Sequence, residues 1–132
     1  NVLINPEHYD RMIENLVDNA ASFAIKSDSK QVRITILDLL SNNNIVTGIG
    51  IIVEDSGKGV TPGEEDKIFN RFYSHREDEQ RKTHSGLGLS TVKAIVDSMN
   101  GKIQVEKSEE LGGASFMVYL PLILDLHSVI DE

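Results

Sequence analysis

The sequence contains no cysteine and no long hydrophobic run, and these absences exclude several classes of protein. Without cysteine there is no disulfide scaffold and no thiolate chemistry, a composition that suits the cytoplasm. No apolar stretch approaches the roughly 18 residues that a membrane helix requires. Nothing resembles a signal peptide, and the first residue is Asn1 rather than Met, so we expect a piece of a longer protein. If that protein is anchored in a membrane, we expect the anchor outside this sequence.

Basic residues are also scarce. The 13 lysines and arginines stand against 21 acidic residues, which gives a net charge of −8. They form no cluster, so the overall charge would repel the phosphate backbone of a nucleic acid, and we expect no nucleic-acid partner. A small anionic nucleotide can still bind where backbone N–H groups and a metal ion supply positive charge.

The chain of 132 residues is long enough for one domain and too short for two. The pattern predicts helices at 6–24, 65–72 and 86–99, and strands at 31–40, 49–54, 102–107 and 114–120. Asn5-Pro6 is typical of a helix start and Asn100-Gly101 of a helix end. The order predicts a two-layer α/β sandwich, with about three helices on one face of a mixed, largely antiparallel sheet. We place the domain at 1–122 and a C-terminal tail at 123–132.

The first predicted strand shows a simple alternation. Its apolar residues Val32, Ile34 and Ile36 alternate with the polar residues Arg33 and Thr35. Successive side chains of a strand point to opposite faces of the sheet. We therefore expect a half-buried strand.

The first predicted helix carries three polar residues on one side, because Asn15, Asn19 and Ser22 lie at i, i+4 and i+7. Asparagine is a mediocre helix former, so two of them in a helix interior lower its local stability. One interpretation is a solvated helix face. The other is a site whose amide oxygens coordinate a hard cation such as Mg²⁺. The pair alone leaves both interpretations open.

A predicted apolar strand ends at Asp55, which is followed by Gly57 and Gly59. A carboxylate in this position can accept a hydrogen bond from an exocyclic amine such as that of adenine. The glycines permit positive φ and a close approach of the backbone to a ligand. The same pattern also occurs in ordinary turns after strands, so both interpretations remain open.

A second glycine-containing segment, residues 85–89, opens the last long helix. Adjacent N–H groups at the positive end of a helix suit a phosphate group. The segment is not a dinucleotide-binding fingerprint, since Thr91 occupies the third glycine position, and it is not a Walker A loop. Its candidate binding residues are Gly86, Leu87, Gly88 and Leu89.

The three elements follow one another within about 75 residues. Together they resemble the superfamily that includes gyrase B, Hsp90, MutL and the sensor histidine kinases, over nearly the whole chain from Tyr9 to Pro121. Within it the chain is similar to the histidine kinases, because it also carries their F box, which gyrase-like members lack. The matching segments are the N box ENLVDNA at 14–20, the first glycine box DSGKG at 55–59, the F box FNRFY at 69–73 and the second glycine box SGLGL at 85–89.

The resemblance implies a Bergerat-type fold that binds ATP with Mg²⁺. It implies Asn15 and Asn19 as catalytic residues, with Asn19 the main Mg²⁺ ligand and Asn15 close to metal and phosphates. Asp55 would receive the adenine amine, in a pocket shaped by Gly57 and Gly59. The other implied nucleotide contacts are Phe23 and Tyr73 beside the base or sugar, and Gly86, Leu87, Gly88 and Leu89 at the phosphates, under a lid at about 60–85.

Asn15 occupies the position that the resemblance assigns to a water-activating Glu in the gyrase-like hydrolases. An amide cannot act as a general base near neutral pH. Catalysis is then expected to rest on positioning and charge neutralisation, with the γ-phosphoryl group passed to a histidine on another domain.

Three positions depart from the family pattern, one of them Ala114, where many relatives have Thr or Ser. Ser22 and Ser74 stand where many relatives have Lys and Arg, which leaves open whether Arg76, Arg81 or Lys82 contacts the γ-phosphate. None of the four histidines has the H-E/D-x-x-x-P context of a phosphoacceptor. We therefore expect the acceptor helices before residue 1.

The resemblance also implies partners and a location. The partners would be the dimerisation and phosphoacceptor domain of the parent kinase and, indirectly, a response regulator. The isolated domain would be a monomer and the parent a homodimer, with the domain in the cytoplasm below an inner-membrane sensor and no direct membrane contact. Two other functions remain open: a degenerate nucleotide-binding regulatory module, and a Ser/Thr-directed kinase of the anti-sigma type, which the F box disfavours.

Overall fold

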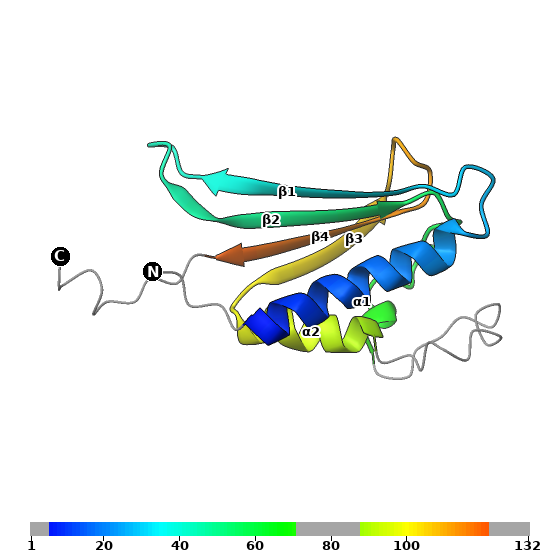
Figure 1. Cartoon of the computed structure of the whole chain (residues 1–132). Helices are drawn as coiled ribbons and strands as arrows, with labels where there is room; N and C mark the ends of the chain where they lie inside the picture. The colour runs from blue at the N-terminus through cyan, green and yellow to red at the C-terminus, as the bar shows by residue number, and fades with distance from the viewer. Residues whose placement is uncertain (1–5, 71–87, 122–132) are drawn as a thin grey trace.

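A computed structural model of the protein describes residues 6–70 and 88–121. The predicted tail at 123–132 and most of the predicted lid lie outside these residues. No helix within them is long and apolar enough to cross a bilayer. The elements, labelled in Figure 1, are α1 (Pro6–Ala24), β1 (Val32–Leu40), β2 (Val46–Asp55), the 3-10 helix η1 (Lys67–Phe69), α2 (Gly88–Ser98), β3 (Lys102–Lys107) and β4 (Ala114–Pro121).

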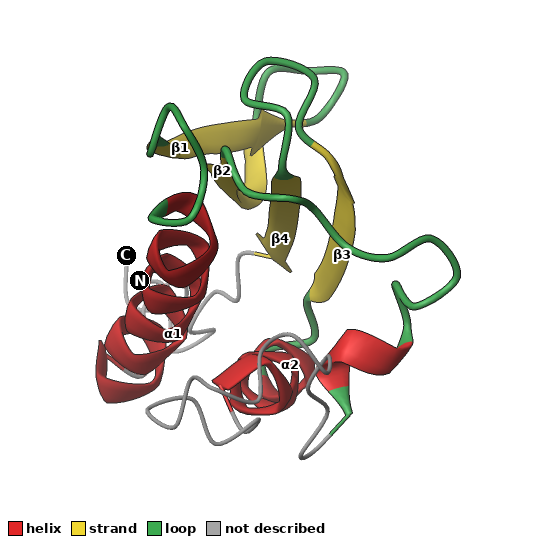
Figure 2. Ribbon diagram, turned by 90° about the vertical axis from the view of Figure 1, so that its right-hand side faces the viewer, coloured by secondary structure: helices red, strands yellow, loops and turns green. Residues whose placement is uncertain are grey.

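The four strands form one sheet in the order β1-β2-β4-β3, and every neighbouring pair is antiparallel. Both α-helices lie on the same side of this sheet (Figures 1 and 2). The predicted two-layer sandwich is therefore confirmed. In the described part of the chain the helical layer has two α-helices and one short 3-10 helix instead of three α-helices, and no strand pair there is parallel.

The core lies between the helices and the sheet. α1 contributes a stripe of buried residues at a spacing of four, and β2 and β4 contribute every second residue, because alternate side chains face the helices. Burial of each large apolar side chain contributes roughly 1.5–3 kcal/mol. The main core residues are Met12, Leu16, Ala20, Ile51, Val53, Val92, Val96, Phe116 and Val118.

β1 forms as predicted, but its apolar side is not buried. Val32, Ile34 and Ile36 are 37%, 45% and 57% exposed, although Ile36 pairs directly with the fully buried Ile51. The reason is position, since β1 is an edge strand of the described sheet. Its side chains reach only the flank of α1, where Ile36 and Tyr9 line a shallow groove. This side of β1 does face the helical layer, as its pairing with β2 shows, but it is more exposed than the predicted half-buried strand implies.

The helix predicted at 65–72 is shorter than expected. It is the three-residue η1, and Asn70 ends it with extended backbone at ψ 146°. Ile68 is buried, and the ring of Phe69 meets Phe116 edge to face, with centroids 6.2 Å apart. The described part of the F box is thus fixed to the core, while Tyr73 lies outside the described residues.

Candidate functional site

Three segments meet at one end of the molecule, on the right in Figure 1. They are the C-terminal half of α1, the end of β2 and the start of α2. α1 and β2 run in the same direction, so the last residue of β2 lies near the last turns of α1. α2 runs the opposite way beside α1, which brings its first turn to the same end. The topology therefore gathers the N box and both glycine boxes, as far as they are described.

Asp55 is the last residue of β2 and is only 1% exposed. Its Oδ1 accepts hydrogen bonds from the backbone N–H groups of Gly57 at 2.8 Å and Ala114 at 3.3 Å. Its Oδ2 is buried without a hydrogen-bond partner in the described structure. Burial raises the pKa of Asp55, against the opposing effect of the two N–H donors. One acceptor atom is thus desolvated and unpaired, which costs roughly 1–3 kcal/mol.

The glycines after Asp55 are needed by the packing itself. A Cβ on Gly57 would lie 2.7 Å from Cβ of Phe23 and 2.9 Å from Oδ1 of Asp55. Gly57 therefore allows the end of β2 to touch α1, and it brings Phe23 next to Asp55. Gly59 has φ +80°, a conformation that favours glycine. Packing at Gly57 and backbone conformation at Gly59 therefore each require glycine, in addition to the predicted ligand contacts.

A wall of the Asp55 site comes from the turn at 108–113, whose role the sequence did not reveal. The N–H of Gly113 donates to the backbone carbonyl of Asp55 at 3.0 Å, and a Cβ on Gly113 would collide with Asp55 and with N of Gly57. The turn is closed by Ser108, whose N–H donates to O of Gly113 at 2.7 Å and whose O accepts from Gly112 at 2.8 Å. The Gly112-Gly113 pair signals a turn, but nothing local shows what it packs against.

Asn15 and Asn19 lie one turn apart on α1 and are both half-buried, so their side of the helix is not simply solvated. Nδ2 of Asn19 is buried without a partner in the described structure. An amide offers either its nitrogen or its oxygen to one place, depending on rotation about its last side-chain bond. The Ser22 hydroxyl, three residues on, donates to the backbone carbonyl of Asn19 at 2.8 Å.

The side chains around this site do not form a carboxylate cage. Among the described residues, no three His, Cys, Asp or Glu side chains gather in a way that suits a metal ion. An Mg²⁺ ion would instead use an amide oxygen of the Asn pair, together with waters and the oxygens of a bound phosphate. The Asn pair therefore fits an Mg²⁺ ion that binds together with a phosphate group and takes most of its other ligands from that phosphate and from water.

The start of α2 presents backbone N–H groups to the same end of the molecule. α2 begins at Gly88, and the side chain of Leu89 packs against the core. The first N–H groups of any α-helix have no partner within the helix, and its N-terminus is partly positive. A Cβ on Gly88 would meet nothing within 4 Å. Gly86 and Leu87 lie outside the described residues, as do Ser74 and the three basic candidates for the γ-phosphate.

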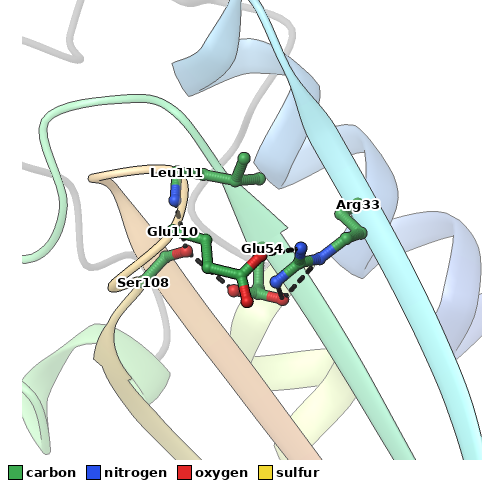
Figure 3. A network of polar contacts seen from close by, with 5 residues as sticks. All are labelled: Arg33, Glu54, Ser108, Glu110 and Leu111. Atoms are coloured by element: carbon green, nitrogen blue, oxygen red, sulfur yellow. Dashed lines mark hydrogen bonds and ion pairs between the residues drawn. The ribbon is translucent and has the colours of Figure 1, made fainter.

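Behind Asp55, on the open face of the sheet, lies a polar network that the sequence did not predict (Figure 3). One oxygen of Glu54 accepts from Arg33 at 2.7 Å and 3.0 Å, and the other accepts from the Ser108 hydroxyl at 2.7 Å. Arg33 also pairs with Glu110. The Ser108 hydrogen bond, and then Arg33, lower the pKa of Glu54 although the residue is buried.

Known proteins resemble this chain in sequence and in fold. The family model described as "Histidine kinase-, DNA gyrase B-, and HSP90-like ATPase" matches residues 4–124. The chain is 33% identical over 121 residues to the sensor histidine kinase CpxA of Escherichia coli (strain K12), which covers 89% of this chain and 24% of CpxA. It is 30% identical over 121 residues to the sensor protein EvgS of the same strain, covering 92% and 10%. The chain thus spans at most a quarter of these relatives.

A solved structure supports the fold. The mycobacterial sensor histidine kinase MprB matches with a TM-score of 0.73 and 24% identity, covering 92% of this chain and 74% of that chain. Family, relatives and fold agree with the resemblance carried by the N, glycine and F boxes. The chain belongs to the histidine kinase-, DNA gyrase B- and HSP90-like ATPase family, and its relatives include the sensor histidine kinase CpxA.

Proposed function

We propose that this domain binds ATP with Mg²⁺ and donates the γ-phosphoryl group to a histidine on a separate domain of its parent sensor kinase. One observation carries the proposal: Oδ2 of Asp55 is buried and unpaired at the position of the family's first glycine box. A ligand N–H in this place removes the cost of the unpaired acceptor. The 6-amino group of adenine is such a donor.

Asn19 is the proposed metal ligand, through its amide oxygen, with Asn15 one turn earlier near the metal and phosphates. Mg²⁺ would neutralise the triphosphate and orient its γ-phosphate. Support comes from the half-buried position of both side chains and from the buried amide nitrogen of Asn19, which has no partner in the described structure. Gly88 and Leu89 would hold phosphate oxygens through the N–H groups at the start of α2.

The remaining roles follow from the same placement. Phe23 touches Gly57 beside Asp55 and would flank the base. Gly57 and Gly59 shape the pocket, and we assign Tyr73, Gly86 and Leu87 by their motif positions alone.

The residue at position 15 favours transfer over hydrolysis. A general base would help water attack the γ-phosphorus, but an amide cannot accept that proton near neutral pH. In the proposed reaction a ring nitrogen of histidine attacks the γ-phosphorus, the bond to the β,γ-bridging oxygen breaks, and ADP leaves. The chain contributes position and charge neutralisation.

The proposal extends to the parent protein. Its dimerisation and phosphoacceptor domain is the direct partner, and a response regulator receives the phosphoryl group afterwards. We assign 1–122 to the catalytic domain and 123–132 to a tail, and we place the domain on the cytoplasmic side of a homodimeric sensor. Support comes from the sensor-protein names of the relatives and from the small share of them that this chain spans.

The test is phosphorylation of the parent's helical phosphoacceptor hairpin by this chain, with γ-labelled ATP and Mg²⁺. We expect acid-labile phosphohistidine that disappears without Mg²⁺. Asn19→Ala should weaken Mg²⁺-dependent ATP binding roughly 10-fold or more. Asn43→Ala, in the exposed β1–β2 turn, is the matched control and should bind normally.

Two outcomes would contradict the proposal. Normal ATP binding without phosphohistidine would favour the degenerate regulatory module. Unchanged Mg²⁺-dependent binding in Asn19→Ala would remove that residue from the metal site.

A further inference from the structure

We infer that Glu54 is a positioning residue for the nucleotide site, because through Ser108 it holds the turn at 108–113 against Asp55. This role rests on the proposed function of Asp55 as the acceptor for the adenine amine. Glu54 and Asp55 are neighbours on β2, so their side chains lie on opposite faces of the sheet. Asp55 shares the face of the buried Ile51 and Val53, and Glu54 lies behind it on the open face.

Both oxygens of Glu54 are occupied, and they connect three parts of the chain (Figure 3). Oε1 accepts from Nη2 and Nε of Arg33 on β1, at 2.7 Å and 3.0 Å. Oε2 accepts from the hydroxyl of Ser108, directly after β3, at 2.7 Å. Glu54 is 8% exposed and Ser108 is 1% exposed, so water does not compete for the second bond.

Ser108 passes this restraint to the whole turn. Its hydroxyl oxygen accepts from the N–H of Leu111 at 3.1 Å, and its carbonyl accepts from Gly112. Its own N–H donates to the carbonyl of Gly113. A side chain that fixes the Ser108 hydroxyl therefore fixes the shape of the turn up to Gly113.

The far end of the turn touches the proposed acceptor. The N–H of Gly113 donates to the backbone carbonyl of Asp55. The N–H of Ala114 donates to the side-chain Oδ1 of Asp55, at the long distance of 3.3 Å. There is no room for a side chain at Gly113. A small displacement of the turn would therefore break the weaker bond to Oδ1 and leave the carboxylate held by Gly57 alone, which loosens the orientation of the unpaired Oδ2.

Arg33 contributes less than Ser108. It lies between two carboxylates, Glu54 on β2 and Glu110 in the turn, and its side chain is 42% exposed. Ion pairs with this much exposure are screened and stabilise little. We therefore expect loss of the buried Ser108 bond to have the larger effect on the site.

The test compares ATP with purine riboside triphosphate, which has hydrogen in place of the 6-amino group. The preference for ATP, measured as the ratio of the two Kd values in Mg²⁺, reports on the acceptor alone. We expect Ser108→Ala to reduce this preference by about 5-fold or more. Glu54→Gln should keep part of it, because its single amide oxygen accepts from Ser108 only when its amide nitrogen faces the exposed Arg33. Asp97→Asn weakens the exposed Lys93–Asp97 pair on α2 and serves as the control with full preference.

The outcomes separate this role from the proposed function. If the unaltered chain shows no preference, or Asp55→Asn keeps it, the acceptor role of Asp55 is wrong. If Asp55→Asn abolishes the preference but Ser108→Ala retains it, the positioning role of Glu54 is wrong. Equal weakening of both ligands in Ser108→Ala, or lower stability alone, overturns it as well. Should Ser108→Ala not fold, Glu54→Asp shortens the reach to Ser108 and must lower the ATP preference.

Discussion

At the scale of single residues, Asp55 is under two opposing influences. Burial disfavours its charged form, while the N–H groups of Gly57 and Ala114 favour it. Burial has the larger effect, so the pKa of Asp55 is raised. An ionised carboxylate can accept from an amine, whereas a carboxyl protonated at Oδ2 is a donor there. The proposed role of Asp55 thereby links nucleotide affinity to the protonation of this one residue.

We expect the affinity for ATP to fall on acidification, beginning at a higher pH than an ordinary aspartate would cause. The contribution of Asp55 to fold stability changes with pH in the opposite direction to its contribution to ATP affinity. A raised native pKa means that Asp55 stabilises the fold below its unfolded pKa, and that this contribution is lost as pH rises through the native pKa. Calorimetric titration of ATP across the acid range measures the effect. Asp55→Asn should lack this step, and a step of equal size in that variant would contradict the assignment.

The neighbouring glycines of the turn at 108–113 need to be glycine for different reasons. Gly112 has φ +91° and open space around it, whereas Gly113 has no room for a Cβ beside Asp55. We expect Gly112→Ala to cost about 1 kcal/mol, from backbone strain alone. Gly113→Ala should cost about 3 kcal/mol, because the overlap involves backbone and a buried carboxylate. Urea unfolding of both variants measures the two losses in the free energy of unfolding. Equal losses would show that the turn can move to make room for a Cβ at Gly113.

At the scale of elements, the edge strand and its neighbour differ in what they contribute. Ile36 on β1 and Ile51 on β2 are paired across the sheet, but the first is 57% exposed and the second fully buried. We expect Ile51→Ala to cost roughly 2–5 kcal/mol and Ile36→Ala below about 1 kcal/mol. Thermal or urea unfolding of the two matched variants measures the difference. A large loss for Ile36→Ala would mean that another part of the protein covers β1.

Helix ends that are marked by residues in the nearby sequence were predicted well. α1 begins at Pro6 and ends at Ala24 as its pattern indicates, and α2 ends where Asn100-Gly101 predicts. Asn100 has φ 58°, and the N–H of Gly101 donates to Val96 at 2.9 Å, which closes the helix. The exposure of β1 was missed, because alternation along a strand reveals two faces but not whether a helix lies over either.

At the scale of the whole molecule, the net negative charge opposes the binding of an anionic nucleotide at the proposed site. A net charge of −8 repels a triphosphate at long range. In the proposed function the attraction is therefore local, from the N–H groups at the start of α2 and from a cation held by amide oxygens. This arrangement suits a ligand that arrives already paired with its metal.

The sequence by itself determined the order of the boxes, the ends of α1, the end of α2 and the presence of the four strands, since each depends on residues a few positions apart. It also pointed to Asn15, Asn19 and Asp55 as candidate site residues. Only the tertiary structure decided which oxygen of Asp55 stays unpaired and what holds it there. The contact from Glu54 to Ser108 joins residues 54 positions apart. Sheet pairing and packing create such contacts, because segments distant in sequence meet only once the register of the strands is set.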